Sequence, residues 1–284
     1  MLPQERLIER VRRCCLADDR IEAALMYGSF AHGEADAHSD IEFWLFFTPD
    51  PDRVDPREWC ARVGPVNYLT VNEHGAHVVF FPGLVRGELH FAAGRDIAGV
   101  RSWPARGAAV TDMVVVDRTG ALSDALRSLP DRPALPRTAE EVDTLCGRFA
   151  NWLVLAHHVA RRGEHLRALD ALAHARRHLL WMARLATGQT AHWLTPSRLA
   201  EAELPADART ALGATAATAD PGQIAAALQA SWACGRGYWA DLGRRHGYAP
   251  PAALLAELDQ ALLAPWHGPD RRHPAVPADP WDAT

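Results

Sequence analysis

The sequence predicts an α+β fold: a small mixed sheet with flanking helices, followed by an all-α helical bundle. Short runs of branched and aromatic residues, separated by breaks typical of hairpins, occupy the first half of the chain. Three prolines stand within residues 130–136, as is typical of a linker. Beyond them, apolar residues recur at helical spacing. We therefore expect domains at residues 1–130 and 138–264, a linker at 131–137 and a loosely ordered tail at 265–284.

The first half combines both kinds of secondary structure. Helical spacing and a proline helix start predict helices over residues 3–17, 56–62 and about 121–129. The predicted strands are residues 22–27, 40–47, 66–72, 76–81, 84–91 and 112–117. Glycine and proline in the breaks at residues 73–75 and 82–83 are typical of hairpins. Residues 66–91 are therefore expected to form an antiparallel meander.

The second half starts with a capping box, in which Thr138 is followed three residues later by Glu141. Gly163 and Gly188 are expected to end the first two helices, because glycine readily takes the left-handed conformation that closes a helix. The expected helices cover residues 138–162 and 164–187, a short stretch from Thr195-Pro196, residues 221–247 and a stretch from Pro250-Pro251.

Composition excludes several classes of partner. The net charge of −5 and the pI near 6.3 argue against nucleic acid or an anionic membrane, because both require a basic surface. No apolar run reaches the length of a membrane span, and the N-terminus lacks the segments of a secretion signal. The five cysteines form no CxxC motif, as expected for reduced thiols. We therefore expect a cytoplasmic protein.

The chain contains 30 basic residues, and all of them are arginine. The lack of lysine excludes Walker A phosphate binding, pyridoxal Schiff bases, Ser-Lys acylation and the lysine of protein kinases. Any cationic contact to a phosphate must come from arginine, which can bind phosphate through two parallel N–H groups. Genomic base composition is an ordinary cause of this bias, and the exclusions hold with either cause.

Residues 26–47 carry the main candidate chemistry. The turn at Gly28-Ser29 follows an apolar strand, where Gly28 lets a phosphate approach the backbone and Ser29 supplies a hydroxyl and free N–H groups. Asp40 and Glu42 are two residues apart on the next strand, so they project to the same face. A divalent cation relieves the repulsion between two such carboxylates, which makes both candidate metal ligands. The alternative is a solvent-facing acidic pair on an edge strand.

Glu88 is the third acidic candidate. It lies in a later strand beside Gly87, whose missing side chain is expected to leave space for Glu88 to point into a cleft. Arg86, on the same strand face, can either bind phosphate or pair with Glu88. His90 follows the same alternation, as a substrate contact or as a structural histidine. Ser39 is a candidate phosphate contact or an ordinary turn residue.

Gly28-Ser29 followed about a dozen residues later by Asp40-x-Glu42 resembles the signature of the polymerase-beta-type nucleotidyltransferase superfamily. Three further stretches make the chain similar to the larger lincosamide nucleotidyltransferases of bacteria: residues 72–75 (NEHG), 84–91 (LVRGELHF) and 192–198 (HWLTPSR). The resemblance covers both halves of the chain. The chain departs from those nucleotidyltransferases that steady the triphosphate with lysine.

The resemblance implies that residues 1–130 are a catalytic domain that transfers AMP from ATP to a hydroxyl of a small molecule. A lincosamide antibiotic is the implied acceptor, and its modification would cause resistance by inactivation. Glu88 is implied as the general base that takes the proton of the acceptor hydroxyl, and as a ligand shared with the other two carboxylates. The implied cofactor is Mg²⁺, with two ions.

The resemblance also implies candidate substrate contacts in the second half of the chain. Trp193 and Arg198 lie in the non-helical stretch HWLTPSR and are candidate substrate contacts, or alternatively packing residues at a helix start. By analogy with related antibiotic nucleotidyltransferases, we expect a homodimer with helices at the interface.

Two other functions remain open at this point. An aminoglycoside acceptor is compatible with the excess of 35 acidic over 30 basic residues. A nucleotidyltransferase-like module that regulates or neutralises a partner protein would bind that partner tightly and turn over few small molecules. A fold retained without catalysis conflicts with the presence of all three carboxylates.

Overall fold

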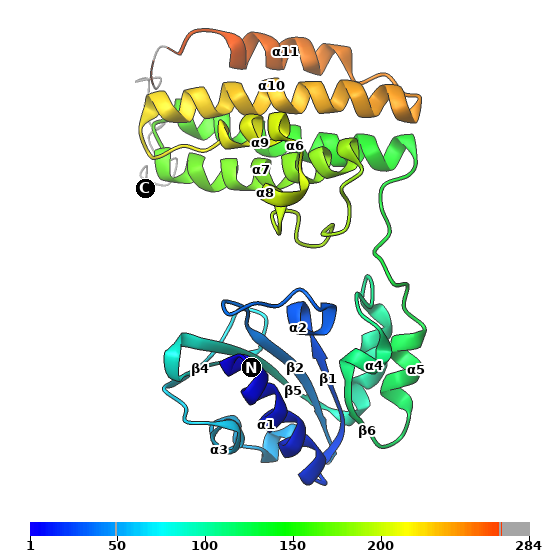
Figure 1. Ribbon diagram of the computed structural model, residues 1–284. Helices are drawn as coiled ribbons and strands as arrows, with labels where there is room; N and C mark the ends of the chain where they lie inside the picture. The colour runs from blue at the N-terminus through cyan, green and yellow to red at the C-terminus, as the bar shows by residue number, and fades with distance from the viewer. Residues whose placement is uncertain (49, 267, 269–284) are drawn as a thin grey trace, which may run out of the picture. The chain divides into compact units, whose positions relative to one another are not determined.

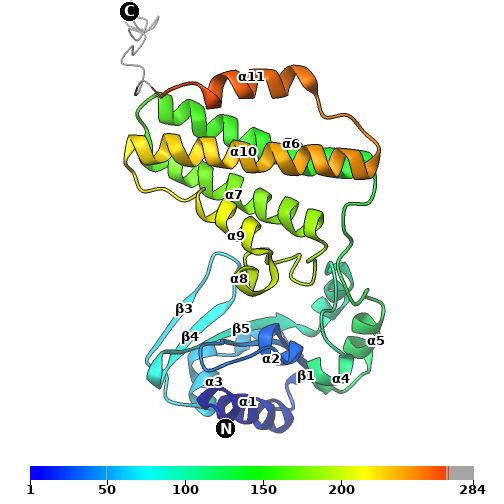
Figure 2. The same cartoon turned by 45° about the horizontal axis from the view of Figure 1, so that its top comes forward.

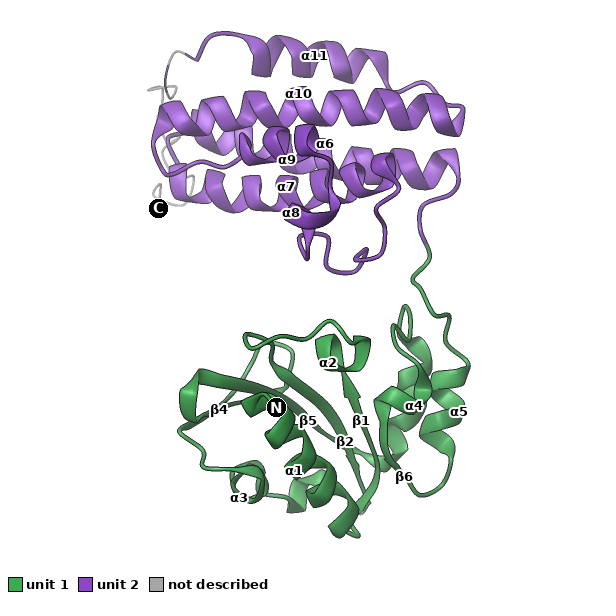
Figure 3. Ribbon diagram, in the orientation of Figure 1, with its two compact units in different colours: residues 1–134 green, residues 135–284 purple. Residues whose placement is uncertain are grey.

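The computed structural model describes residues 1–48, 50–266 and 268. The chain divides into two compact units, residues 1–134 and 135–284 (Figure 3). Unit 1 contains a mixed sheet with helices around it, and unit 2 is helical (Figure 1). The predicted α+β fold class is therefore confirmed.

Unit 1 is built on one six-stranded sheet with strand order β3-β4-β5-β2-β1-β6. Its strands are β1 (Ile21–Tyr27), β2 (Ile41–Phe47), β3 (Tyr68–Val71), β4 (His77–Phe81), β5 (Val85–Ala93) and β6 (Val114–Asp117). Its helices are α1 (Pro3–Ala17), α2 (Gly28–His32), α3 (Pro56–Val63), α4 (Val110–Met113) and α5 (Ala121–Arg127), with 3-10 turns η1 (Pro51–Arg53), η2 (Pro82–Leu84) and η3 (Gly94–Ser102). All neighbouring strands are antiparallel except β2 and β5. The antiparallel meander predicted for β3, β4 and β5 is confirmed.

One face of the sheet is covered by α1 and α3, which lie side by side (Figures 1 and 2). Ile41, Phe43 and Leu45 of β2 point to this face and have no exposed surface. Trp59 of α3 packs edge-on against Phe91 of β5. This burial fixes the register of β2, because a slip of one residue would turn its apolar side chains to the opposite face.

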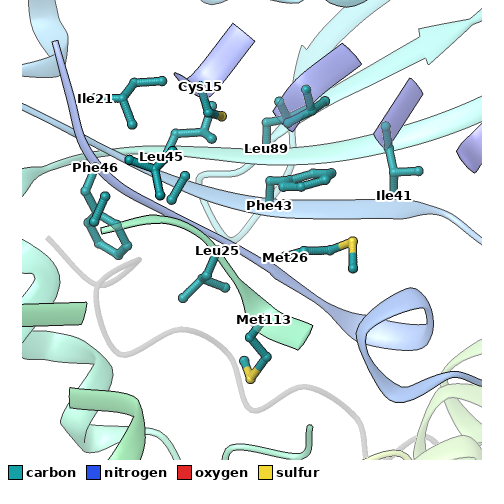
Figure 4. Close-up of a cluster of buried hydrophobic side chains, with 14 of the residues drawn as sticks. Cys15, Ile21, Leu25, Met26, Ile41, Phe43, Leu45, Phe46, Leu89 and Met113 are labelled. Carbon is teal, nitrogen blue, oxygen red and sulfur yellow. The ribbon is translucent and has the colours of Figure 1, made fainter. Parts of the chain in front are cut away.

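The opposite face is covered over part of its width. Packing of η3, α4 and α5 on β1, β2 and β6 buries Leu25, Phe46 and Met113. Figure 4 shows Leu25 and Met113 on this side of the sheet, and Cys15 of α1 and Leu89 on the other. Over β3, β4 and β5, the same face carries several side chains with exposed surface. This open part of the sheet holds the candidate site.

The last strand begins later than the sequence predicted. Residues 112–117 were expected to be a strand, but Asp112 and Met113 belong to α4, and β6 starts at Val114. The backbone N–H groups of Asp112 and Met113 both donate to the carbonyl of Ala109, at 3.0 and 3.2 Å. These bonds close a helical turn and leave both residues out of the strand ladder.

Unit 2 is a bundle in which α6, α7 and α10 pack against one another and α11 packs on α10 (Figure 1). The helices are α6 (Ala139–Arg161), α7 (His165–Thr187), α8 (Ala200–Glu203), α9 (Ala206–Gly213), α10 (Pro221–His246) and α11 (Ala252–Leu263). The predicted capping box of α6 is confirmed, since the Glu141 N–H donates to Thr138 Oγ1 at 3.1 Å and the Thr138 N–H donates to Glu141 Oε2 at 3.0 Å. No helix in the described ranges is long and apolar enough to cross a membrane. Apart from residues 265, 266 and 268, the predicted tail at 265–284 lies outside the described residues.

The third helix predicted for this half does not start at Thr195 and Pro196, which lie in a series of turns. The carbonyls of Pro196 and Arg198 accept hydrogen bonds from the guanidinium of Arg184. Leu199 follows with a φ of 49°, a left-handed conformation that is uncommon outside glycine. These contacts hold the segment in a non-helical shape, and helix begins again only with α8.

Candidate active site

The register of the central strands brings two of the predicted carboxylates side by side. In the parallel pair of β2 and β5, Glu42 lies beside Glu88, so both side chains project from the same face. On the other side of Glu42, the antiparallel partner β1 contributes Tyr27. Asp40 directly precedes β2 and joins the group through Arg86. The structure therefore brings all three predicted carboxylates together in unit 1.

The turn at Gly28-Ser29 holds one of these carboxylates. Gly28 has a φ of 70°, in the region that favours glycine. A hydrogen bond joins the backbone N–H of Ser29 to the Glu42 carboxylate. A Cβ added to Gly28 would lie 1.5 Å from Glu42 Oε2. Glycine is thus required at this position both by the backbone conformation and by the close approach of Glu42, a contact that sequence analysis missed.

The reason predicted for the outward direction of Glu88 is wrong, although Glu88 does reach the site. Gly87 projects to the opposite face of the sheet, where the space of its missing side chain is taken up by packed residues. A Cβ at position 87 would lie 2.9 Å from Val79 Cγ1 and 3.2 Å from Ile41 Cγ1. Gly87 therefore allows close packing under the sheet, and strand alternation alone directs Glu88 into the site.

Arg86 lies between two of the carboxylates. Its guanidinium forms ion pairs with Asp40 Oδ2 and with Glu88 Oε2, the second at 2.6 Å. Pairing with Glu88, one of the two alternatives predicted for Arg86, is therefore present. With all three carboxylates ionised, the cluster of these side chains and Arg86 carries a formal charge of −2.

This excess of negative charge appears in the acidity of Glu42. Burial of the side chain, followed by the charges of Asp40 and Glu88, raises the pKa of Glu42 from 4.5 to about 7. Arg86 and the Ser29 N–H oppose this shift. Burial and the nearby Glu88 also raise the pKa of Tyr27. A carboxyl group with a raised pKa among like charges is stabilised in its ionised form by an added cation.

Two aromatic residues of the site, Tyr27 and Trp44, were missed by sequence analysis. The Tyr27 hydroxyl donates to Glu88 Oε1 at 3.2 Å and lies 3.2 Å from His90 Nε2. The His90 ring stacks on Trp44, with ring centroids 3.9 Å apart. His90 is thus held between two aromatic side chains next to Glu88. The position of Tyr27 directly before Gly28 was the available sequence signal, but its partner Glu88 could not be inferred without the strand order.

The loop that carries Asp40 is fixed by side-chain hydrogen bonds. Ser39 Oγ accepts the Asp36 N–H at 3.0 Å and donates to Asp36 Oδ1 at 3.1 Å, which is the geometry of a turn residue. Gln4 of α1, only 2% exposed, donates through Nε2 to the carbonyls of Ala37 and Ser39, at 2.8 and 3.2 Å. Gln4 therefore positions Asp40 from a distant part of the sequence.

The donor chemistry of the site fits Mg²⁺. Carboxylate oxygens are the ligands that hard divalent cations prefer, and the raised pKa of Glu42 marks negative charge that Arg86 leaves unbalanced. Within the described ranges, no three His, Cys, Asp or Glu side chains already stand in the arrangement of a metal site. The guanidinium of Arg86 stands between Asp40 and Glu88. A cation shared by these carboxylates would replace the contacts of Arg86.

The remaining predicted contacts, Trp193 and Arg198, belong to unit 2. Their segment is organised by Arg184 of α7, which has no exposed surface. Arg184 Nη1 donates to the Gln189 carbonyl at 2.8 Å and to Glu203 Oε2 at 2.6 Å, and Nη2 donates to the Arg198 carbonyl. Trp193 is partly buried against the core of the unit. Sequence analysis missed Arg184, because an arginine in an amphipathic helix gives no sign that it is buried.

The fold and the site together have the features of a nucleotidyltransferase, namely a mixed sheet that joins a Gly-Ser turn to three carboxylates. Residues 138–260 match the family model described as the C-terminal domain of lincosamide nucleotidyltransferase-like proteins. The helical unit is therefore a domain of this type, and the predicted membership in the nucleotidyltransferase superfamily is confirmed.

Comparisons of the whole chain give weaker similarities. An aminoglycoside 6-adenyltransferase from Bacillus subtilis is 14% identical with a TM-score of 0.42, over 92% of this chain and 98% of that chain. A nucleotidyltransferase-like protein from Exiguobacterium sibiricum 255-15 is 13% identical with a TM-score of 0.36, over 93% of this chain and 81% of that chain. No curated protein sequence matches the chain. The superfamily assignment accordingly rests on the match of the helical unit.

Proposed function

We propose that the protein is an Mg²⁺-dependent adenylyltransferase that moves AMP from ATP to a hydroxyl of a lincosamide antibiotic. The observation that carries this proposal is the convergence of Asp40, Glu42 and Glu88 beside the Gly28-Ser29 turn. The family match of residues 138–260 supports lincosamides as the acceptor class. Cytoplasmic location and a homodimer belong to the same proposal.

The residues of unit 1 would have separate roles in the transfer reaction. Asp40, Glu42 and Glu88 would hold Mg²⁺, in two ions, which supplies charge stabilisation at the phosphates. Glu88 accepts the proton of the acceptor hydroxyl as its oxygen attacks the α-phosphorus, while the bond to pyrophosphate breaks. Tyr27 holds Glu88 through its Oε1, which leaves Oε2 for the proton once Arg86 turns to the phosphates.

The test is a direct assay of adduct formation. Purified protein, Mg²⁺ and each nucleoside triphosphate are incubated with lincomycin or clindamycin, and mass spectrometry identifies the nucleotide added. An aminoglycoside is assayed in parallel. An AMP adduct of the lincosamide is expected. An adduct of the aminoglycoside alone would replace the acceptor, and no adduct with any pair would remove the proposed acceptors and leave the superfamily assignment in place.

A variant of Glu88 tests the role of the third carboxylate. Glu88→Gln keeps the shape and loses the base, so kcat should fall about 10²–10⁴-fold, as for other general bases. The matched control is Glu73→Gln, because Glu73 is an exposed glutamate in the turn between β3 and β4. Unchanged kcat in Glu88→Gln would contradict the assigned role.

Light scattering of the same preparations measures whether the protein is a dimer.

A further inference from the structure

The open part of the sheet extends beyond Glu88 in one direction. The strand register places Val78 of β4 beside Glu88 and Thr70 of β3 beside Val78. In the neighbouring row, Phe80 lies beside Arg86 and Tyr68 beside Phe80. Directly paired residues share a face, so these four side chains continue the surface from which Glu88 projects. We call Tyr68, Thr70, Val78 and Phe80 the β3–β4 shelf.

The shelf is aromatic and partly exposed. Tyr68 is 58% exposed, and its ring lies beside that of Phe80 with centroids 6.3 Å apart. Val78 is 5% exposed and lies beside Glu88 in the strand register. Elsewhere on this face, side chains such as Leu25 and Phe46 are covered by helices and turns of unit 1. Exposed aromatic side chains next to a reactive group are a common mark of a ligand surface.

The direction from which the acceptor hydroxyl attacks indicates which substrate the shelf would bind. The Gly28-Ser29 turn lies on the β1 side of Glu42, so the phosphates of the donor are expected on that side. In an in-line displacement, the attacking oxygen and the leaving group stand on opposite sides of the phosphorus. The acceptor hydroxyl must also reach Glu88. It therefore approaches from the β4 side, across the shelf.

The chemistry of the shelf narrows the class of acceptor. None of its four side chains carries a charge, and the nearest charged partner along its rows, apart from Glu88, is the cation Arg86. We propose, on the basis of the proposed function, that the shelf binds the acceptor as a hydroxylated ring molecule with an apolar face and few charges. Aromatic rings pack on such a face, and the Tyr68 hydroxyl can hydrogen-bond its polar edge. A polycationic acceptor would find no carboxylate on the four shelf residues, and Glu88 at the end of their row is paired with Arg86.

Steady-state kinetics with lincomycin and ATP tests this site. Tyr68→Ala and Phe80→Ala should each raise the KM for lincomycin about tenfold, with kcat and the KM for ATP changed less than about twofold, because the rings lie off the nucleotide side. Val71→Ala is the matched control, since Val71 is on the same strand, 55% exposed, and pairs with His77 on the opposite face. Phe80→Leu serves as the milder variant if Phe80→Ala unfolds.

The outcomes separate the shelf from the proposed function. Turnover of lincomycin that is unchanged in the Tyr68 and Phe80 variants would overturn the shelf and leave the function standing. An equal rise in both KM values would also overturn it, because the effect would not be specific to the acceptor. Wild-type protein that adenylates a polycationic aminoglycoside in preference to lincomycin would overturn the assigned substrate class. Absence of all turnover would overturn the function and the shelf together.

Discussion

Two clusters of arginine and carboxylate side chains in unit 1 have opposite charge balances. After α1, the single carboxylate of Asp18 pairs with Arg20 and Arg62, each at 2.8 Å. At the candidate active site, three carboxylates lie together and one guanidinium, that of Arg86, pairs with two of them. The hydrogen bond from Arg20, and then that from Arg62, hold the pKa of Asp18 well below its usual range. Burial and like charges instead raise the pKa of Glu42 to about 7.

The difference separates a structural cluster from a functional one. The Asp18 cluster is complete as it stands, because its buried carboxylate is paired with two arginines and its oxygens are hydrogen-bonded. The active-site cluster has three carboxylates and a single arginine paired with two of them, so it keeps an excess of negative charge. Perturbed acidity of this kind is common at functional sites. An excess of negative charge, rather than the number of ion pairs, therefore marks the site.

The largest expected effect comes from crowding the unbalanced cluster. Gly28→Ala adds a methyl group only 1.5 Å from Glu42 Oε2, so the Glu42 side chain must move. We expect kcat/KM to fall about 10²-fold or more because Glu42 is displaced. The control is Gly33→Ala, since Gly33 has a similar φ of 72° but no atom within 4 Å of the added Cβ. It carries the same backbone strain without the collision. Equal loss of activity in both variants would show that strain alone is responsible.

Breaking the Asp18 cluster should affect stability and spare activity. Asp18→Asn removes the charge from a carboxylate that is 7% exposed and leaves two arginines without their partner. The free energy of unfolding should fall by about 1.5–3 kcal/mol, the usual range for hydrogen bonds to charged groups. Urea denaturation measures this loss, and kcat should stay close to the wild-type value. A stable but inactive variant would contradict the distinction between the clusters.

The last expected effect is a pair of opposite pH dependences in protein freed of metal by chelation. The native-state pKa of Glu42, about 7, lies above its ordinary 4.5, so its contribution to stability is full below pH 4.5 and is lost as pH rises to about 7. Asp18 has a lowered pKa, so its contribution is present above pH 3.8 and is lost as pH falls.

Urea denaturation between about pH 3 and 8, the range in which the Glu42 and Asp18 carboxyl groups titrate, measures how the free energy of unfolding changes with pH. Glu42→Gln should flatten the decline between pH 4.5 and 7, and Asp18→Asn should flatten the acid loss. Added Mg²⁺ should also reduce the decline in the wild-type protein, because a cation favours ionised Glu42. A stability that rises through this range in the wild type and not in Glu42→Gln would reverse the sign assigned to Glu42.

Local patterns predicted most of the elements and the strands that carry Glu42 and Glu88, but not α9 or the start of β6. The two-residue spacing predicted that Asp40 and Glu42 share a face, and Ile41 between them has no exposed surface. What could not be predicted depends on pairing between distant strands. The contact of Gly28 with Glu42 and that of Tyr27 with Glu88 both follow from the order β5-β2-β1, which a single sequence does not specify.

Residues 189–203 contain no long helix, yet Arg184 holds this segment in a defined conformation. The segment is joined to α7 through one buried guanidinium, which donates to three of its backbone carbonyls and to the Glu203 carboxylate. A loop held in this way has little conformational entropy left to lose. Any molecule that contacts Trp193 or Arg198 would therefore meet a preorganised surface, and the cost of ordering that surface would already have been met during folding.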